Sequence, residues 1–163
     1  LDLKGHYEND VASEIDPTFY QRILEAFPDA VIEDPIINSP TRQLFDGEEE
    51  RVSWDAPITG VDSLRDLPWE PSWLNVKPSR FGTVRSLLNT VEHAKRQDIT
   101  LYGGGQFELG PGRTQIQALA SLLYPGGPND VAPGIYNEPG LPADAPIECL
   151  DISPESGIAG DGE

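Results

Sequence analysis

Short apolar runs alternate along the chain with longer segments in which apolar residues recur every three or four positions. The short runs are rich in β-branched and aromatic residues, which is typical of strands. They lie at residues 30–33, 51–55, 73–77, 99–102 and 130–132, and residues 1–3 look like the end of another strand. Strands separated by helices predict a parallel sheet, because right-handed crossovers carry the chain from one strand to the next.

The longer segments have the apolar spacing of helices that bury one face. Three of them repeat the pattern i, i+3, i+4, i+7, and we expect these stripes to pack in the core. The stripes are Tyr20, Ile23, Leu24 and Phe27; Val84, Leu87, Leu88 and Val91; and Ile116, Leu119, Ala120 and Leu123. Asp16 before Pro17 predicts an N-cap followed by proline at the first helical position. Residues 40–47 and 61–67 are weaker helical segments.

Alternating strands and helices fit either an open doubly wound sheet or a closed (β/α) barrel. We find about six strands, whereas a closed barrel has eight. The sequence therefore predicts an α/β fold, an incomplete (β/α) barrel over residues 1–137. From Glu138 onward Pro, Gly, Asp and Glu dominate, so we expect residues 138–163 to be an irregular acidic tail. Because Leu1 already lies in a strand and no Met occurs, we expect the chain to be part of a longer one.

Acidic residues outnumber basic ones by 28 to 11, which gives a formal net charge of −17. We expect no nucleic-acid partner, because such a surface repels phosphates, and the excess of acid is what a halophilic source would explain. No apolar run approaches the ~20 residues that cross a bilayer, so we expect no membrane partner. The single Cys149 cannot form an internal disulfide, which favours the cytoplasm.

Charged residues stand at the ends of four predicted strands, about one strand–helix repeat apart: Asp2, Glu33, Asp55 and Lys77. Parallel strands end at the same edge of a sheet, so we expect these side chains to converge. Three carboxylates in a partly buried site repel one another unless a cation lies between them, and hard oxygen ligands suit Mg²⁺. The sequence thus predicts that Asp2, Glu33 and Asp55 bind Mg²⁺, with Lys77 beside the metal.

Such a site suits removal of the proton next to a carboxylate. The product is an enediolate, whose negative charge a divalent cation stabilises as it develops. A lysine beside a cation has a lowered pKa and can act as a base near neutral pH.

The ordered motifs resemble the enolase superfamily, and in particular its muconate-cycloisomerase-like subgroup. The resemblance rests on Asp2, on Val31-Ile32-Glu33-Asp34-Pro35, on Asp55, on Asn75-Val76-Lys77-Pro78-Ser79-Arg80-Phe81-Gly82, and on the glycine-rich segment from Tyr102 to Arg113. It implies a barrel whose third, fourth and fifth strands end in the metal ligands Asp2, Glu33 and Asp55. It also implies Lys77 as the base, or as a cation beside the enediolate, and Glu108 as a residue that lines the pocket.

Further candidates for contact with a carboxylate substrate lie near these motifs. Arg80 and Arg113 have the charge and geometry to hold a carboxylate, or else they cap helices. Gly104 and Gly105 lie in a glycine run that suits a cradle for an anion, or more simply a close approach of backbone to ligand.

The chain also departs from the family pattern. Lys4 stands where the family usually has Asn, two residues after the first ligand. The family's second-strand Lys-x-Lys pair and its substrate-capping domain have no counterpart in this chain. We therefore expect an N-terminal segment or a second chain to complete the barrel, or a homo-oligomer. Cycloisomerases, dehydratases and racemases share this half of the site, so lyase and isomerase activities both stay open.

Two other functions are compatible with the sequence. Glu33 and Glu108, after the fourth and seventh strands of a barrel, are where many barrel glycosidases carry their acid and nucleophile. Alternatively, an incomplete barrel could be a non-catalytic binding module, whose open strand edge at Leu1 needs covering.

Overall fold

A parallel sheet forms the centre of the fold. The computed structural model describes residues 1–3, 16–106, 108 and 110–131. Its strands, in the order β1-β2-β3-β4, are β1 (Ile32–Glu33), β2 (Val52–Trp54), β3 (Trp73–Val76) and β4 (Thr100–Gly103). Single parallel bridges, Asp2 to Glu33 and Gly103 to Asn129, continue the pairing at both edges. The predicted parallel α/β sheet is confirmed, and the incomplete (β/α) barrel of about six strand–helix units stays a prediction.

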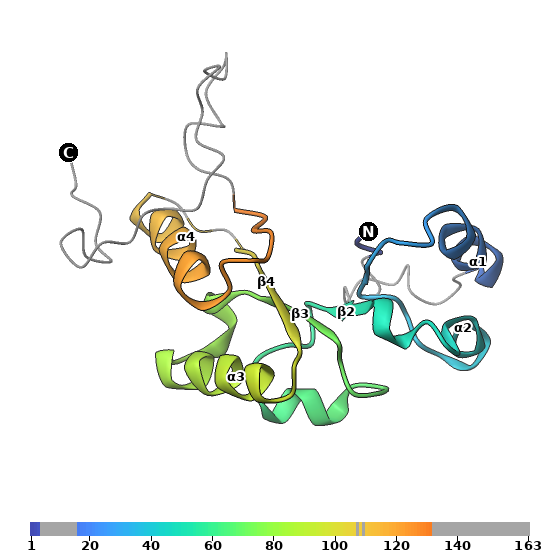
Figure 1. The fold of residues 1–163 in the computed structure, drawn as a ribbon, viewed down its shortest axis with the longest axis horizontal. Helices are drawn as coiled ribbons and strands as arrows, with labels where there is room; N and C mark the ends of the chain where they lie inside the picture. The colour runs from blue at the N-terminus through green and yellow to red at the C-terminus, as the bar shows by residue number, and fades with distance from the viewer. Residues whose placement is uncertain (4–15, 107, 109, 132–163) are drawn as a thin grey trace, which may run out of the picture.

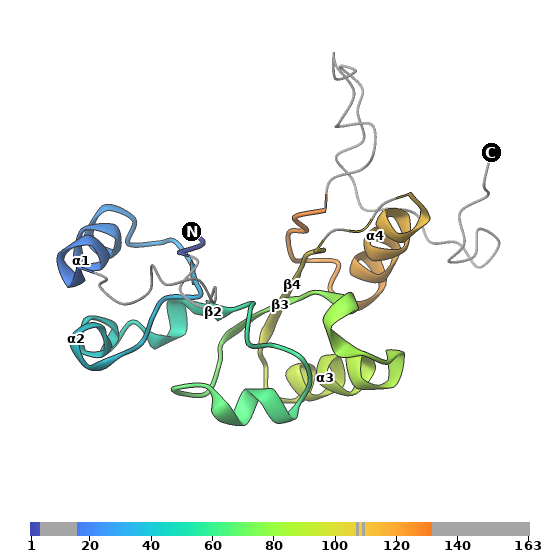
Figure 2. The same cartoon turned by 180° about the vertical axis from the view of Figure 1, so that it is seen from behind.

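Helices connect the strands and lie towards the two ends of the sheet, α1 and α2 at one end and α3 and α4 at the other (Figures 1 and 2). The α-helices are α1 (Pro17–Ala26), α2 (Ser39–Arg42), α3 (Val84–Arg96) and α4 (Pro111–Leu123). The 3₁₀ turns are η2 (Gln43–Phe45), η3 (Glu49–Arg51), η4 (Asp62–Asp66) and η5 (Pro78–Phe81). The predicted N-cap is confirmed, since the Asp16 side chain accepts a hydrogen bond from the Thr18 N–H. In the described part of the chain, no helix has the length and apolarity that crossing a bilayer requires.

The apolar stripes of the helices are buried only in part. In α3, Leu87 and Val91 are buried as predicted, together with Thr90 and Ala94, but Val84 is 70% exposed and Leu88 46%. The prediction was wrong for these two residues, because the buried face of α3 is the one that carries Leu87, Thr90, Val91 and Ala94. It was also wrong for Phe27, which is 50% exposed at the C-cap of α1. In α4 the stripe does pack: Ile116 and Ala120 are buried, and Leu119 and Leu123 are partly buried.

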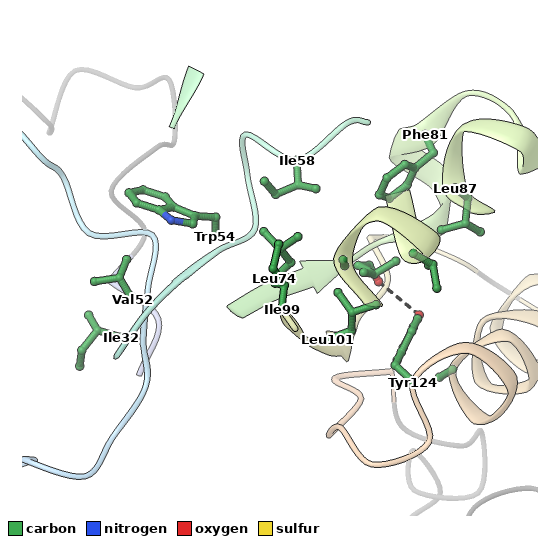
Figure 3. Close-up of a cluster of buried hydrophobic side chains, with 14 of the residues drawn as sticks. Ile32, Val52, Trp54, Ile58, Leu74, Phe81, Leu87, Ile99, Leu101 and Tyr124 are labelled. Carbon is green, nitrogen blue, oxygen red and sulfur yellow. Dashed lines mark hydrogen bonds between the residues drawn. The ribbon is translucent and has the colours of Figure 1, made fainter. Parts of the chain in front are cut away.

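The two faces of the sheet differ in chemistry. Residues paired across parallel strands point to the same face, and neighbours along a strand point to opposite faces. The apolar face carries Ile32, Val52, Trp54, Leu74, Val76 and Leu101, all buried (Figure 3). The register places Glu33, Ser53, Asn75 and Tyr102 together on the opposite face. That polar face, and the edge at which the strands end, hold the charged residues of interest.

The N-cap of α3 allows a first test of the fold. Thr83 caps this helix, and its hydroxyl accepts a hydrogen bond from the Ser86 N–H at 3.1 Å. Thr83→Ala is expected to lower the free energy of unfolding by about 1 kcal/mol, because one helical N–H loses its partner. Thr83→Ser keeps the hydroxyl and serves as the control, and urea unfolding measures both. Equal stability of the two variants would contradict the capping role.

Candidate functional site

The edge at which the parallel strands end collects the charged residues that we predicted there. Asp2 forms a bridge with Glu33 at the end of β1, Asp55 directly follows β2, and Lys77 directly follows β3. The negative charges of Asp55 and Asp2 both act on Glu33. Spacing along the sequence therefore predicted which residues meet at this edge.

Asp55 is a buried charge at the edge, with 1% of its surface exposed. Lys77 Nζ donates to Asp55 Oδ2 at 2.8 Å, and Arg80 Nη1 donates to Asp55 Oδ1 at 2.7 Å. Arg80 Nη1 also donates to the backbone oxygen of Asp55 at 2.6 Å. Lys77 is itself buried, and the side chain of Arg80 is mostly buried. One buried carboxylate is thus held between two cations.

The backbone around Asp55 is fixed by a residue that the sequence motifs did not single out. Asp34 is fully buried, and its two carboxylate oxygens accept from the N–H groups of Asp55 (2.9 Å) and Ala56 (2.8 Å). Asp34 has φ +49°, a left-handed conformation that Asp tolerates better than most residues. The signal in the sequence was the Asp between the predicted ligand Glu33 and Pro35.

Lys77 is a cation in this arrangement. Burial lowers its pKa, but the hydrogen bond and charge of Asp55, with the charge of Asp130, outweigh burial and raise the pKa overall. Asp130 Oδ2 lies 3.6 Å from Lys77 Nζ. The direction is opposite to the one that we predicted for a lysine beside a metal ion. Of the two roles implied by the resemblance, the ion pairs favour a cation.

Glu33 belongs to a chain of hydrogen bonds across the polar face of the sheet. The Tyr102 hydroxyl and Asn75 Nδ2 both donate to Glu33 Oε2, the amide at 3.3 Å, and Ser53 Oγ lies 2.8 Å from the Tyr102 hydroxyl. Burial raises the pKa of Glu33, the hydrogen bonds from Tyr102 and Asn75 oppose it, and the charges of Asp55 and Asp2 add to the rise. Burial and the bond to Glu33 also raise the pKa of Tyr102, so its hydroxyl stays a donor.

These side chains do not fit a magnesium site formed by Asp2, Glu33 and Asp55. Both oxygens of Asp55 are engaged by Lys77 and Arg80, and one oxygen of Glu33 takes two donors. Within the described ranges, no three His, Cys, Asp or Glu side chains are grouped so that they could hold a metal ion. Mg²⁺ and its three ligands therefore stay predictions from the sequence.

The glycine run after β4 contacts carboxylates of the chain itself. The Gly105 N–H donates to Asp130 Oδ1 at 2.9 Å, and the Gln106 N–H donates to Glu108 Oε2 at 2.6 Å. A Cβ on Gly104 would lie 2.6 Å from Asp130 Oδ2, so only glycine lets this carboxylate approach. Backbone N–H groups of the glycine run thus bind anions, as predicted, but these anions are carboxylates of the chain itself. Contact of Gly104 and Gly105 with a substrate stays a prediction.

Glu108 and Arg113 line a small hollow of about 310 Å³ together with Gly105 and Asp130. Burial raises the pKa of Glu108, but hydrogen bonds from Ser79 and the backbone and the charge of Lys77 outweigh it and lower the pKa overall. Glu33 lines a different hollow, of about 430 Å³, which shares Asp130 with the first. This separation does not favour a glycosidase pair of Glu33 and Glu108.

Two solved structures have a similar fold. One is a crystal structure of a member of the enolase superfamily from Listeria innocua Clip11262, with 20% identity and a TM-score of 0.59 over 80% of this chain and 35% of that one. The other is a probable mandelate racemase from Alicyclobacillus acidocaldarius, with 24% identity and a TM-score of 0.59 over 81% of this chain and 34% of that one. The chain spans about a third of the length of each, and its fold is similar to that part of these two proteins.

Comparison of sequences gives the family. No curated protein matched the chain. A model of the C-terminal domain of DUF8230, described as a domain of unknown function, matches residues 1–138. Because this match covers most of the sequence, the chain belongs to the DUF8230 C-terminal domain family.

Proposed function

We propose that this chain supplies part of the active site of a lyase or isomerase that removes the proton next to a substrate carboxylate. The observation that carries the proposal is the buried cluster of Lys77, Asp55 and Arg80 where the parallel strands end. In α/β folds this edge is where ligands bind and catalytic residues gather. The likeness in fold to part of two enolase-superfamily proteins adds support.

The proposed chemistry needs a positive charge held in place. A base removes the proton from the carbon next to the carboxylate, and the electron pair of the C–H bond moves into the carboxylate group. Two negative oxygens result, and the Lys77 ammonium stabilises them. A charge fixed in advance in a partly dry site stabilises such an intermediate without reorganising at the moment of reaction. Return of the proton to the other face gives an isomerase, and loss of a neighbouring group gives a lyase.

Asp55 and Arg80 act through Lys77 in this proposal. Asp55 Oδ2 holds the lysine ammonium at 2.8 Å, and Arg80 holds the other oxygen of the same carboxylate. Asp55 is therefore a positioning residue. With Arg80 the three side chains carry one net positive charge, for which a carboxylate substrate competes with Asp130, 3.6 Å from Lys77 Nζ. A carboxylate substrate is the partner that such a cluster suits.

Parts of the proposal come from the sequence alone. These are magnesium, the muconate-cycloisomerase-like subgroup, and an N-terminal segment or second chain that completes the barrel. A divalent ion bound by Asp55 would have to compete with Lys77 and Arg80, which already engage both oxygens of that carboxylate. The proposed role of Lys77 does not depend on the metal.

Proton exchange in D₂O tests this role. The full-length protein is incubated with a panel of carboxylic acids, with Mg²⁺ and with a chelator, and NMR follows loss of the signal of the proton next to the carboxylate. Lys77→Ala is expected to slow this exchange roughly 100- to 1000-fold, the usual effect of removing one group that stabilises a developing oxyanion.

Lys95→Ala is the matched control, because Lys95 is exposed in the last turn of α3. It should exchange at the parent rate, and Lys77→Arg, which keeps the charge, should retain part of the activity. Circular dichroism checks that each variant is folded. Exchange at the parent rate in folded Lys77→Ala would refute the role of Lys77, and no exchange by the parent with any acid would refute the proposed reaction.

A further inference from the structure

The polar face of the sheet contains a hollow of about 430 Å³ that the proposed role of Lys77 does not use. Its lining includes the carboxylates of Asp2, Glu33 and Asp130, the amide of Asn75, and the aromatic rings of Trp73 and Tyr102. No Lys, Arg or His side chain lines it within the described part of the chain. The volume lies within the ~300–1,000 Å³ range of small-molecule sites.

Asn75 places an unused acceptor in this hollow. The residue is 2% exposed, and its Oδ1 atom is buried without a hydrogen-bond partner among the described residues. The amide orientation is fixed by its neighbour, because Nδ2 donates to Glu33 Oε2 and the reverse orientation would set two acceptors against each other. A buried acceptor without a donor is costly, so an N–H or O–H group of a ligand that bonds to Oδ1 would be stabilised.

The charges of the lining indicate what kind of donor fits. Asp2 and Glu33 interact through their charges, and Asp130 is shared with Lys77 at 3.6 Å. The three carboxylates of the lining outnumber its cation, the terminal ammonium group of Leu1, which donates to the Val31 carbonyl oxygen at 2.6 Å. The resulting negative potential attracts a positively charged donor. The lining includes no three side chains that could hold a metal ion, and the aromatic rings suit an organic cation, since their π-faces attract ammonium groups.

We propose that this hollow binds the primary ammonium group of a small organic molecule, whose N–H groups bond to Asn75 Oδ1 and to the carboxylates of Asp2 and Glu33. The inference goes beyond the proposed function, because it concerns binding and holds whether or not the protein removes a proton. If both are right, the substrate carries an amino group as well as a carboxylate.

Calorimetric titration with simple probes tests the inference, using the full 163-residue chain at low ionic strength so that charges are not screened. Butylammonium chloride is the ligand, 1-butanol is its neutral analogue, and tetramethylammonium is a cation without N–H groups. Butylammonium is expected to bind at least about tenfold more tightly than either, because each analogue lacks the charge or the donor.

Variants connect the binding to the hollow. Asn75→Leu removes the buried acceptor at similar volume and is expected to weaken binding of butylammonium about tenfold. Asn89→Leu, at an exposed position of α3, is the matched control and should bind like the parent. Asp2→Asn changes an exposed residue and should weaken binding several-fold without affecting the fold, so the test holds even if Asn75→Leu is unstable.

Three results would overturn the inference. Equal affinity for butanol and butylammonium would make the hollow merely apolar. Unchanged binding to folded Asn75→Leu and to Asp2→Asn would place the ammonium elsewhere. Displacement of butylammonium by MgCl₂ at equal or lower concentration, lost in Asp2→Asn, would make the hollow a metal site. Exchange of the substrate proton is not measured in any of these titrations, so their failure does not bear on the proposed function.

Discussion

Asp55→Ala is expected to lower the free energy of unfolding by about 3–5 kcal/mol, the usual cost of removing one partner from a buried ion pair. The carboxylate of Asp55 holds the Lys77 ammonium at 2.8 Å and the Arg80 guanidinium at 2.7 Å. Without it, two cations face each other in a site that water barely reaches. Lys77 keeps Asp130 at 3.6 Å and Arg80 keeps the backbone oxygen of residue 55, so the loss comes from the missing carboxylate and from the repulsion between the two cations.

Urea unfolding measures this loss as a lower midpoint at unchanged slope. The matched control is Asp62→Ala, which breaks the Arg65–Asp62 pair, also 2.8 Å long but 75% and 90% exposed. Water and salt screen that pair, so its loss should cost less than about 1 kcal/mol. Equal losses in the two variants would show that burial does not increase the contribution of the Asp55 ion pairs to the free energy of unfolding.

The combined variant Asp55→Leu, Lys77→Met, Arg80→Met tests whether the buried charges cause the loss of stability. Replacing an entire buried ionic cluster by apolar side chains is often neutral, so this variant should recover most of the stability that Asp55→Ala loses. If the combined variant is instead less stable than Asp55→Ala, the loss comes from packing around Asp55 and not from the unpaired cations.

The sequence predicted the positions of Glu33, Asp55 and Lys77 well, for a reason that lies in the topology. Parallel strands joined by helices all end at the same edge, so a residue that follows one strand must lie near a residue that follows the next. What the spacing could not give is the partner of each charge. Lys77 reaches Asp55 directly from the end of β3, the neighbour of β2, and Arg80 reaches it from η5, the 3₁₀ turn that follows. The path of the chain through this turn cannot be predicted from the spacing of charged residues.

The polar face of the sheet was missed for a different reason. Ser53, Asn75 and Tyr102 meet Glu33 only in the observed strand register, and a shift by one residue would turn each side chain to the opposite face. Sequence alone does not fix the register of parallel strands joined by long connections. A usable signal existed, because each of these polar residues lies between apolar neighbours that are buried on the other face: Val52 and Trp54, Leu74 and Val76, and Leu101 before Tyr102.

Asp34→Ala is expected to lower the free energy of unfolding by about 2–4 kcal/mol, the second large effect at this edge. The substitution removes two hydrogen bonds from backbone N–H groups to a buried charge, each worth about 1.5–3 kcal/mol, although partial relaxation reduces their sum. It also puts alanine at φ +49°, where a β-carbon is strained. Asp34→Asn keeps one acceptor oxygen and tolerates that φ, so it should lose about half as much.

Asp98→Ala measures the cost of placing alanine at a positive φ without the loss of buried hydrogen bonds. Asp98 also has a positive φ, +55°, but it is exposed at the end of α3, so its substitution should cost only the backbone strain of about 1 kcal/mol. Thermal and urea unfolding of the three variants then separate conformation from hydrogen bonding. A loss in Asp34→Ala no larger than in Asp98→Ala would mean that the bonds to Asp55 and Ala56 contribute little.

The double variant Asp34→Ala, Asp55→Ala decides whether Asp34 acts through Asp55. If Asp34 serves chiefly to orient the Asp55 carboxylate towards Lys77, the part of its loss that depends on that carboxylate disappears once Asp55 is alanine. The double variant should then lose at least about 1 kcal/mol less than the two single losses added together, which is the coupling that residues in one network show. Strict additivity would mean that Asp34 supports only the backbone after β2 and that the ion pairs of Asp55 form without its help.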